Sequence, residues 1–379
     1  MNLSGLNYLI VGAGFYGAVI AERIAADLGQ QVLLIDKRKH IGGNSFSAPD
    51  PTTGIECHCY GSHIFHTQNR DVWEYINCFT DFNSYRHKVL TRYQGRTFIM
   101  PINLSTINSL YNLDLSPAQA AIFIQEEAAR EGITLPSNLE EKAISLIGRP
   151  LYEAFIRGYT IKQWQTDPRD LPAAIITRLP VRCNHHYDYF DDPWQGIPIG
   201  GYGALFERML DHPLIDLQLD TDYFAIKDQI PKTCKVIYTG PIDRFFEYRY
   251  GTLGWRTIRF EQEVVETGDY QGTAVVNYAD PETPYTRIHE FRHYHPEQNT
   301  YPKNRSIIYH EYSLPAGRED DPYYPINTVK DREIYELYQR DCEQLPNMLF
   351  GGRLGMYRYL DMDKVIEQAL ELYAGRIRV

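Results

Sequence analysis

The sequence predicts an α/β protein that combines a Rossmann-like domain, an inserted helical subdomain and an antiparallel β-sheet domain. Three observations support this class. Residues 7–36 read as strand, glycine turn, helix and strand, residues 105–165 carry helical periodicity, and residues 253–312 alternate in the manner of antiparallel strands. A chain of 379 residues is long enough for two or three such domains.

The composition excludes several function classes. The 38 Lys and Arg against 49 Asp and Glu give a net charge of −11, which argues against non-specific binding to nucleic acid or anionic membranes. The longest apolar stretch, Tyr8 to Ala21, is shorter than the roughly 20 residues that a membrane-spanning helix needs. We therefore expect a cytoplasmic protein with no nucleic-acid partner and no membrane insertion.

The cysteine pattern does not predict a metal site. The six Cys form no CxxC pair. The triplet Cys57-His58-Cys59 is weak evidence for a metal, because successive residues of a strand point to opposite faces. We expect free thiols in a reducing compartment and no bound metal.

The first βαβ unit carries a dinucleotide fingerprint. Gly12, Gly14 and Gly17 form G-x-G-x-x-G between an apolar strand and a helix that ends at Gly29. The first glycine allows a tight turn, the second lets the backbone approach a pyrophosphate, and the third lets helix pack on strand. Asp36 ends the next strand, where an acid can bind a ribose hydroxyl. Since both flanks have the correct context, a dinucleotide site is favoured over an ordinary glycine-rich turn.

A second glycine pair indicates which dinucleotide is bound. IGGN, residues 41–44, follows the ribose acid closely, a pattern more typical of FAD proteins than of NAD dehydrogenases. GGR at 351–353, followed by a helix from about Met362, places amide donors where they would stabilise negative charge on a reduced flavin. The joint pattern favours FAD over NAD.

The remaining elements follow in order. Ser116-Pro117 is a helix start, and helical segments continue to Trp164, whereas four prolines mark 166–194 as a long functional loop. A strand at 236–240, the alternating segment, a helix at 331–345, a strand and turn at 348–355 and a final helix complete the chain. The predicted units are residues 1–84, 195–244 and 345–379 as the dinucleotide-binding domain, 103–165 as the helical subdomain, and 85–102, 166–194 and 245–344 as the sheet domain, with a mobile loop at 166–180.

Nine motifs carry a family resemblance. They are YGSHIFHT (60–67), YEAFIRGYTIKQW (152–164), LPVRCNHHYDYF (179–190), QGIP (195–198), YTGPID (238–243), YQGTAVVNY (270–278), PYTRI (284–288), DPYYPIN (321–327) and GGRLGMYRYLDMD (351–363). Together they closely resemble bacterial UDP-galactopyranose mutase, and the resemblance runs from Tyr8 to about Leu370.

The resemblance implies an isomerase that interconverts UDP-galactopyranose and UDP-galactofuranose for the synthesis of galactofuranose-containing glycans. In that family reduced FAD acts without net redox change. Its N5 attacks the anomeric carbon, UDP leaves, a flavin iminium forms, the sugar ring opens and recloses, and UDP returns. The resemblance also implies a homodimer.

The family's residue roles transfer to matching positions of this sequence. The catalytic residues are Arg178 in the mobile loop and Arg287, which hold the diphosphate, and His63 near the flavin. The residues expected to bind substrate are Phe155, Tyr159, Trp164, Tyr189, Asn277, Tyr324, Tyr359 and Asp361. Those expected to bind FAD are Gly12, Gly14, Phe15, Gly17, Asp36, Lys37, Gly43, Asn44, His63, Ile64, Arg353, Tyr359, Leu360, Asp361 and Met362.

Physical chemistry agrees with these roles. Two Arg provide always-charged planar forks that match phosphate oxygens, which explains how an acidic chain could bind an anion. A loop bounded by prolines could close over the substrate and reopen. Two positions depart from the family pattern: Ser62 stands where Pro or Ala is usual, and His87 stands where some members carry Asn.

Other readings remain open. Taken singly, an Arg could belong to a surface ion pair, and Trp164, His63, Tyr324 or Tyr359 could be packing residues. A flavin oxidoreductase such as an amine oxidase could share the fold, and so could a binding module without catalysis. An oxidoreductase would need a hydride-donating substrate and usually an apolar cage, whereas the Arg pair and the Tyr set suit a diphosphate.

Overall fold

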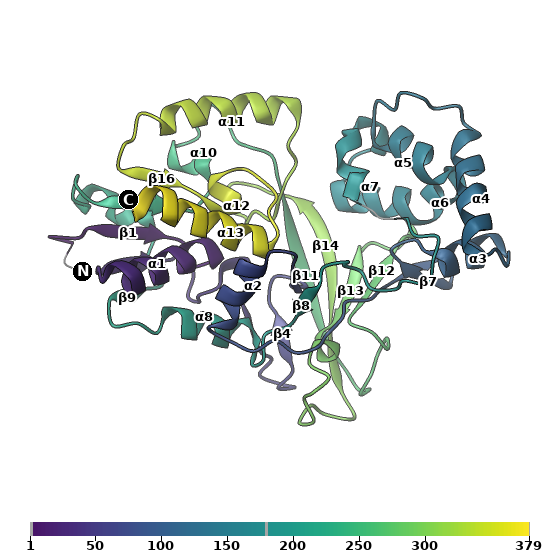
Figure 1. The fold of residues 1–379 in the computed structure, drawn as a ribbon, viewed down its shortest axis with the longest axis horizontal. Helices are drawn as coiled ribbons and strands as arrows, with labels where there is room; N and C mark the ends of the chain where they lie inside the picture. The colour runs from purple at the N-terminus through teal and green to yellow at the C-terminus, as the bar shows by residue number, and fades with distance from the viewer. Residues whose placement is uncertain (1–2, 179–180, 379) are drawn as a thin grey trace.

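The computed structural model describes residues 3–178 and 181–378 of the chain. Two large sheets lie side by side, and a lobe of helices projects beyond the second sheet (Figure 1). Both termini lie at the far end of the first sheet. No helix in the described part of the chain is long and apolar enough to cross a bilayer.

The first sheet has five parallel strands in the order β16-β10-β1-β2-β9. Its central strands read YLIV and VLLI, as expected of a parallel sheet that is covered on both faces. The strands are β1 (Tyr8–Val11), β2 (Val32–Ile35), β9 (Ile215–Gln218), β10 (Lys235–Tyr238) and β16 (Met348–Phe350).

Helices α1 and α13 pack against each other on this sheet, and α8 also contacts α1. The helix α1 (Phe15–Leu28) ends where Gly29 adopts a left-handed conformation, as the sequence predicts. The other helices of this part are α2 (Arg70–Asn77), α8 (Gly201–Leu210), α9 (Tyr223–Ile226), α10 (Ile242–Phe245), α11 (Val329–Cys342), α12 (Gly352–Gly355) and α13 (Met362–Leu372).

The second sheet has seven strands in the order β15-β11-β14-β13-β12-β6-β7. Its pairs are antiparallel except β12 with β6, which run parallel. The prediction of an antiparallel sheet is therefore confirmed with one exception, which joins segments far apart in the sequence. The strands are β6 (Val89–Tyr93), β7 (Arg96–Met100), β11 (Trp255–Val265), β12 (Val275–Tyr278), β13 (Arg287–Glu290), β14 (Ser306–Pro315) and β15 (Tyr324–Pro325).

The described residues also form two small ribbons, one local and one that joins distant segments. They pair β3 (Ser47–Pro49) with β4 (Glu56–His58) and β5 (Phe65–Thr67) with β8 (Trp194–Gly196). All six cysteines are free thiols.

The helical lobe begins earlier than the Ser116-Pro117 signal. A helix at Leu104–Tyr111 precedes it, capped by Asn103. Ser116 and Gln119 then form the capping box that starts the next helix. The helices are α3 (Leu104–Tyr111), α4 (Pro117–Ala129), α5 (Leu139–Ile147), α6 (Arg149–Leu151), the π-helix η2 (Tyr152–Arg157) and α7 (Gly158–Trp164). The predicted loop at 166–194 contains two short 3₁₀ segments, η3 (Pro168–Asp170) and η4 (Ala173–Arg178).

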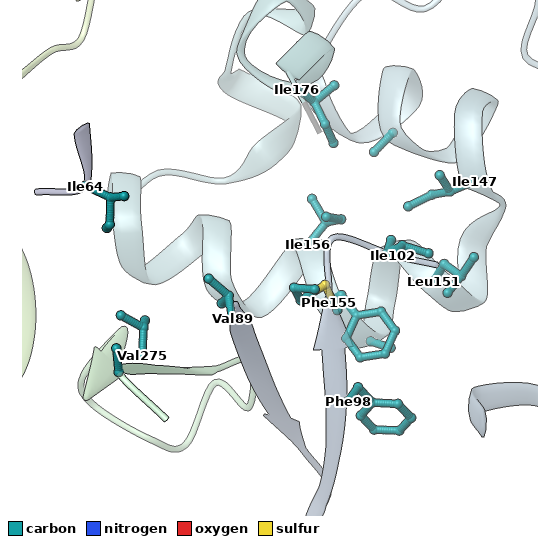
Figure 2. Close-up of a cluster of buried hydrophobic side chains, with 14 of the residues drawn as sticks. Ile64, Val89, Phe98, Ile102, Ile147, Leu151, Phe155, Ile156, Ile176 and Val275 are labelled. Carbon is teal, nitrogen blue, oxygen red and sulfur yellow. The ribbon is translucent and has the colours of Figure 1, made fainter. Parts of the chain in front are cut away.

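One hydrophobic cluster connects the lobe to the second sheet and to the segment that follows β4. Figure 2 shows Val89, Phe98 and Val275 of the sheet beside Phe155 and Ile156 of the π-helix. The same cluster reaches Ile64 on one side and Leu151 and Ile147 on the other (Figure 2). Because the core is continuous across these parts, packing fixes their positions relative to one another.

Candidate active site

A cavity of about 800 Å³ lies where the second sheet, the helical lobe and the first domain meet. It is lined by residues of the 60–66 segment, the π-helix and α7, strands β6, β12, β13 and β14, and the 353–362 segment. Every residue predicted to bind substrate lines this cavity, and so does His63. The members are Phe155, Tyr159, Trp164, Tyr189, Asn277, Tyr324, Tyr359 and Asp361.

Strand register builds one wall of the cavity. Asn277 lies opposite Arg287, and Arg287 lies opposite Glu311, on three neighbouring antiparallel strands. Cross-strand partners share a face of a sheet, so these side chains form a polar row that faces the cavity. The Oδ1 atom of Asn277 is buried and has no hydrogen-bond partner in the described structure. Such an atom suits a ligand that donates a hydrogen bond.

Glu311 anchors Arg287 from behind. The Arg287 Nε atom lies 3.2 Å from Glu311 Oε1, an ion pair without the alignment of a hydrogen bond. Burial acts to raise the pKa of the Glu311 carboxyl, but Arg287 and His289 outweigh it and hold this pKa at about 2. Burial acts to lower the pKa of Arg287, and Glu311 more than compensates. Both groups are therefore charged at neutral pH.

Tyrosine rings surround the guanidinium. Arg287 Nη2 donates to the Tyr159 hydroxyl, and the guanidinium carbon lies 5.7 Å from that ring's centre. Tyr324 stacks on Tyr359 with 5.9 Å between ring centres, and the Arg353 guanidinium lies 4.9 Å from the Tyr359 ring centre. Burial raises the pKa values of Tyr159, Tyr324 and Tyr359, so these phenols bring hydrogen bonds without charge.

Helix geometry sets the apolar end of the cavity. Phe155 belongs to the π-helix, is 5% exposed, and meets Phe98 edge to face at 5.0 Å. Trp164 is the last residue of α7. The Tyr189 amide donates to the carbonyl of His87, two residues before β6, and so ties the 181–194 segment to the entry of that strand. Aromatic rings of this kind suit a flat, partly apolar group such as a nucleobase.

A second cavity of about 210 Å³ lies at the dinucleotide fingerprint. Gly12 has a φ of 108°, and a Cβ there would lie 2.0 Å from the Thr239 hydroxyl. Gly14 and Gly43 bring two backbone loops together, since a Cβ on Gly43 would lie 3.2 Å from Gly14 Cα. Helix α1 starts there without a side-chain cap, so its first amides are available to a phosphate. This cradle of bare backbone fits the diphosphate of a dinucleotide.

The predicted cofactor residues fall into three groups. Gly17 packs the helix on the strand, because a Cβ there would lie 1.9 Å from the Gly12 carbonyl oxygen. Ile64, Tyr359 and Asp361 line the large cavity. The second cavity is lined by Gly12, Gly14, Phe15, Asp36, Lys37, Gly43, Asn44, His63, Arg353, Leu360 and Met362.

Asp36 organises the fingerprint. Its carboxylate accepts the backbone N–H groups of Ala13 and Arg38, both at 2.8 Å. Lys37 pairs with Asp321 at 3.2 Å. The acid at the end of β2 thus holds the glycine turn in place while it lines the cofactor cavity.

The two cavities meet at three residues. His63, Arg353 and Met362 line both of them. His63 Nδ1 lies 2.7 Å from the Gly61 carbonyl, so the proton sits on Nδ1 and Nε2 is an acceptor. Burial is the main cause that lowers the pKa of His63 to about 4, and the ring is neutral. A dinucleotide bound at the fingerprint has its reactive ring at this junction if it extends along the cleft.

Arg178 belongs by its backbone to η4, but its side chain lies outside the described residues. Sequence reasoning missed Glu311, which lines the cavity beside Arg287, and the buried His289 next to it. It noted Ser62, which also lines the cavity, only as a departure from a pattern. Glu311 stands in an alternating strand, where its inward direction becomes evident only once the strand register is known.

Comparisons with known proteins agree with this geometry. A family profile described as UDP-galactopyranose mutase matches residues 154–359, and one described as an NAD(P)-binding Rossmann-like domain matches residues 10–79. A probable UDP-galactopyranose mutase of Klebsiella pneumoniae is 43% identical, covering 97% of this chain and 94% of the relative. A dTDP-fucopyranose mutase of Escherichia coli is 40% identical, covering 96% of each. A crystal structure of reduced UDP-galactopyranose mutase has a similar fold, with a TM-score of 0.71, 17% identity and coverage of 97% of this chain and 95% of that one.

Proposed function

The chain belongs to the UDP-galactopyranose mutase family of FAD-dependent enzymes, and on that premise we propose that it interconverts UDP-galactopyranose and UDP-galactofuranose by covalent catalysis on reduced FAD. The enzyme is an isomerase, and its product serves the synthesis of galactofuranose-containing glycans. We extend the proposal to a cytoplasmic homodimer and to the domain boundaries expected from the sequence.

One observation carries the proposal. A single polar row on the second sheet places Arg287 in a tyrosine-lined cavity that shares His63, Arg353 and Met362 with the dinucleotide cradle. An oxidase for an apolar or amine substrate has no use for a fixed guanidinium among neutral phenols. A nucleoside diphosphate sugar does need such a guanidinium, because its leaving group carries phosphate charge.

The residues along the cavity have different proposed roles. Bound FAD, when reduced, supplies the nucleophilic nitrogen for the anomeric carbon. Arg287 and Arg178 neutralise the diphosphate as it leaves and keep it close for the return step. Tyr159, Tyr324 and Tyr359 donate hydrogen bonds to it. Phe155 and Tyr189 hold the nucleoside, and Trp164 borders the sugar and the loop. Asn277, Asp361 and His63 line the sugar and flavin side.

The decisive experiment compares the two redox states. The purified protein is incubated with UDP-galactofuranose after dithionite reduction, and an air-oxidised sample is treated in parallel, with chromatography of the nucleotide sugars. We expect UDP-galactopyranose from the reduced sample only. Conversion by both samples would contradict nucleophilic catalysis by reduced flavin, and conversion by neither would contradict the reaction.

The E. coli relative makes dTDP-fucose the sharpest competing substrate. The same assay with dTDP-fucofuranose therefore runs beside the first, on the same reduced enzyme. We expect a higher kcat/KM for the UDP-galactose pair, in line with the closer identity to the Klebsiella relative. A preference for the dTDP-fucose pair would assign this chain to that sugar within the family.

A further inference from the structure

A continuous chain of hydrogen bonds runs behind Arg287. The Tyr294 hydroxyl donates to Ser62 Oγ, Ser62 Oγ lies 2.5 Å from His289 Nδ1, and His289 Nε2 lies 2.8 Å from Glu311 Oε2. The other carboxylate oxygen, Oε1, faces Arg287. The chain thus joins the 60–63 segment, which carries His63, to the guanidinium on β13.

The chemistry of its members fixes the direction of this chain. Glu311 is ionised and can only accept, so His289 carries its proton on Nε2. Burial lowers the pKa of His289, so the ring is neutral and Nδ1 is an acceptor. Ser62 must then donate to Nδ1, while its oxygen accepts from Tyr294. Every donor in the chain meets an acceptor in one consistent direction.

The chain has little freedom to rearrange. His289 is fully buried and Glu311 is 2% exposed, so no water replaces a lost partner at either group. Thr286 Oγ1 also donates to Glu311 Oε1, at 3.2 Å. The 60–63 segment packs directly on the carboxylate, since a Cβ on Gly61 would lie 3.7 Å from Glu311 Oε2. The orientation of the carboxylate therefore depends on the partner that Ser62 gives to His289.

We propose that Ser62 is a positioning residue for the phosphate site: its hydroxyl donates to His289 Nδ1 and holds the ring in the orientation in which Nε2 donates to Glu311, and Glu311 in turn sets the direction of the Arg287 guanidinium. The inference rests on the proposed function in one respect, the diphosphate ligand. It assigns a role to a position where the family pattern has Pro or Ala, neither of which can donate a side-chain hydrogen bond. The logic is that of a buried acid that holds a histidine tautomer, with the chain running to an arginine instead of a nucleophile.

The test measures UDP binding to the oxidised holoenzyme by calorimetry for Ser62→Ala and for the isosteric pair Ser62→Thr and Ser62→Val. We expect the dissociation constant for UDP to rise about three- to tenfold in the Ala and Val variants, the range for one lost hydrogen bond. The Thr variant retains a hydroxyl and should stay within about twofold of the native protein. FAD content and melting temperature confirm that each variant is folded.

A second experiment repeats Ser62→Ala in a protein that lacks Arg287. It distinguishes a positioning role of Ser62 from direct contact between Ser62 and the ligand. In Arg287→Ala protein, Ser62→Ala should change UDP binding by less than about twofold, because the group that Ser62 positions is gone. An undiminished effect in that background would show that Ser62 touches the ligand itself, and would overturn the proposal. Equal binding by the native, Ala and Thr proteins would overturn it too.

A spectroscopic readout tests the hydrogen-bond chain without a ligand. Nitrogen NMR of ¹⁵N-histidine protein should show a neutral His289 with its proton on Nε2, assigned by the loss of that signal in His289→Gln. Ser62→Ala should shift the His289 Nδ1 signal, and Ser62→Thr should restore it. An unchanged signal contradicts the inference. Turnover of UDP-galactose is assayed separately, so a protein that binds UDP as described but converts no sugar contradicts the proposed function alone.

Discussion

The Arg287–Glu311 pair decides the electrostatic character of the cavity. Cross-strand register places the two residues opposite each other, and burial of Glu311 makes the guanidinium direction depend on the carboxylate. The pair also allows a cation to stay in a buried site when no anion is bound. The sheet itself thus determines the position from which Arg287 is proposed to bind phosphate.

Replacement of Arg287 tests this role. Arg287→Ala should lower kcat/KM at least about 100-fold, because the diphosphate loses a charged, forked partner in a buried site. Arg287→Lys, the matched control, retains the charge but loses the planar fork. Its kcat/KM should lie between that of the native protein and that of Arg287→Ala. FAD content should match that of the native protein, since Arg287 does not line the cofactor cavity. An Ala variant with full activity would rule out the assigned role.

Buried histidines predict how stability depends on pH. Burial lowers the pKa of His63 to about 4 and that of His87 to about 3, against about 6.5 in an unfolded chain. At a pH between the folded and the unfolded pKa values, these histidines are protonated in the unfolded chain but not in the folded protein. The free energy of unfolding therefore falls as the pH falls below about 6.5. Each ring should cost on the order of 2 kcal/mol of unfolding free energy by pH 5.

Urea melts at pH 7 and pH 5, with FAD in excess, measure this loss. His87→Asn retains a polar side chain but removes one titrating ring, so the difference between the two pH values should shrink in the variant. A native protein whose unfolding free energy is the same at both pH values would contradict the buried, neutral state of these rings.

At the residue level, sequence patterns predicted most of the residues expected to contact a ligand. They did not predict the residues that hold those side chains in place. The motif residues Tyr159, Arg287 and Tyr359 all face the cavity. Ser62, His289 and Glu311 could not be connected in advance, because their contacts depend on the pairing of β13 with β14 and on the path of a distant loop. A support residue is recognisable only by what it touches.

Among the elements, α7 and the turn between β12 and β13 act as one unit. The Lys162 ammonium donates to the carbonyls of Tyr278, Asp280 and Tyr285, at 2.6, 2.9 and 3.1 Å. Burial lowers the pKa of Lys162 to about 8, despite the nearby acids Asp280 and Glu282, which act to raise it. The contact ties the helix that carries Tyr159 to the turn that leads into Arg287.

Gly158→Ala tests this close contact. In a helix the change normally stabilises by about 1 kcal/mol, but here the new Cβ would lie 2.1 Å from the Ala279 carbonyl oxygen. Backbone must move, so the clash should win, with a net loss of about 1–3 kcal/mol and a lower kcat/KM. Gly375→Ala, in the C-terminal helical segment Tyr373–Ile377 where a Cβ meets nothing within 4 Å, is the control, and it should gain up to about 1 kcal/mol with kcat/KM unchanged. Equal stability of the two variants would contradict the tight packing of α7.

Elements with local signals were predicted well, and elements that depend on distant partners were not. Three elements agree with prediction: the first βαβ unit, the capped helix at Pro117 and the terminal helix. The glycines, caps and apolar periodicity that determine them lie within their own sequences. The π-helix at Tyr152–Arg157 has the same apolar spacing as an α-helix and was expected as one. The parallel pairing of β6 with β12 joins residues about 190 positions apart, and no local pattern reports it.

In the whole molecule, the second sheet and the lobe share one core, and the 55–64 segment extends from the first domain into it, while the first sheet and its helices have clusters of their own. The cluster in Figure 2 contains residues from the N-terminal segment, the second sheet and the lobe, and the β5–β8 ribbon joins residues 65–67 to 194–196. Separate unfolding of one part would expose apolar surface of the others. Packing of this kind favours a single cooperative transition.

Two probes test that cooperativity. Flavin fluorescence reports on the FAD-binding domain. In a Trp73→Phe background, the remaining tryptophans Trp164, Trp194 and Trp255 report on the lobe, on the β5–β8 ribbon and on the second sheet. Their urea midpoints should coincide, and FAD at about 100 times its dissociation constant should add about 2.7 kcal/mol to both. Midpoints that separate, or FAD protection seen by only one probe, would contradict a shared core.

The strand order β16-β10-β1-β2-β9 has a consequence for how the chain is made. β1 leaves the ribosome early, but its neighbour β10 follows roughly 200 residues later, a delay on the order of 10–40 s at about 5–20 residues per second. The edge strand β16 follows β10 only after roughly another 110 residues. Until β9 and β10 are made, the first βαβ unit must therefore wait with both edges of its sheet unpaired, exposed to chaperones and to other nascent chains. The cavity proposed for FAD needs the 351–362 segment, so FAD should bind only after that segment has been made and not to earlier intermediates.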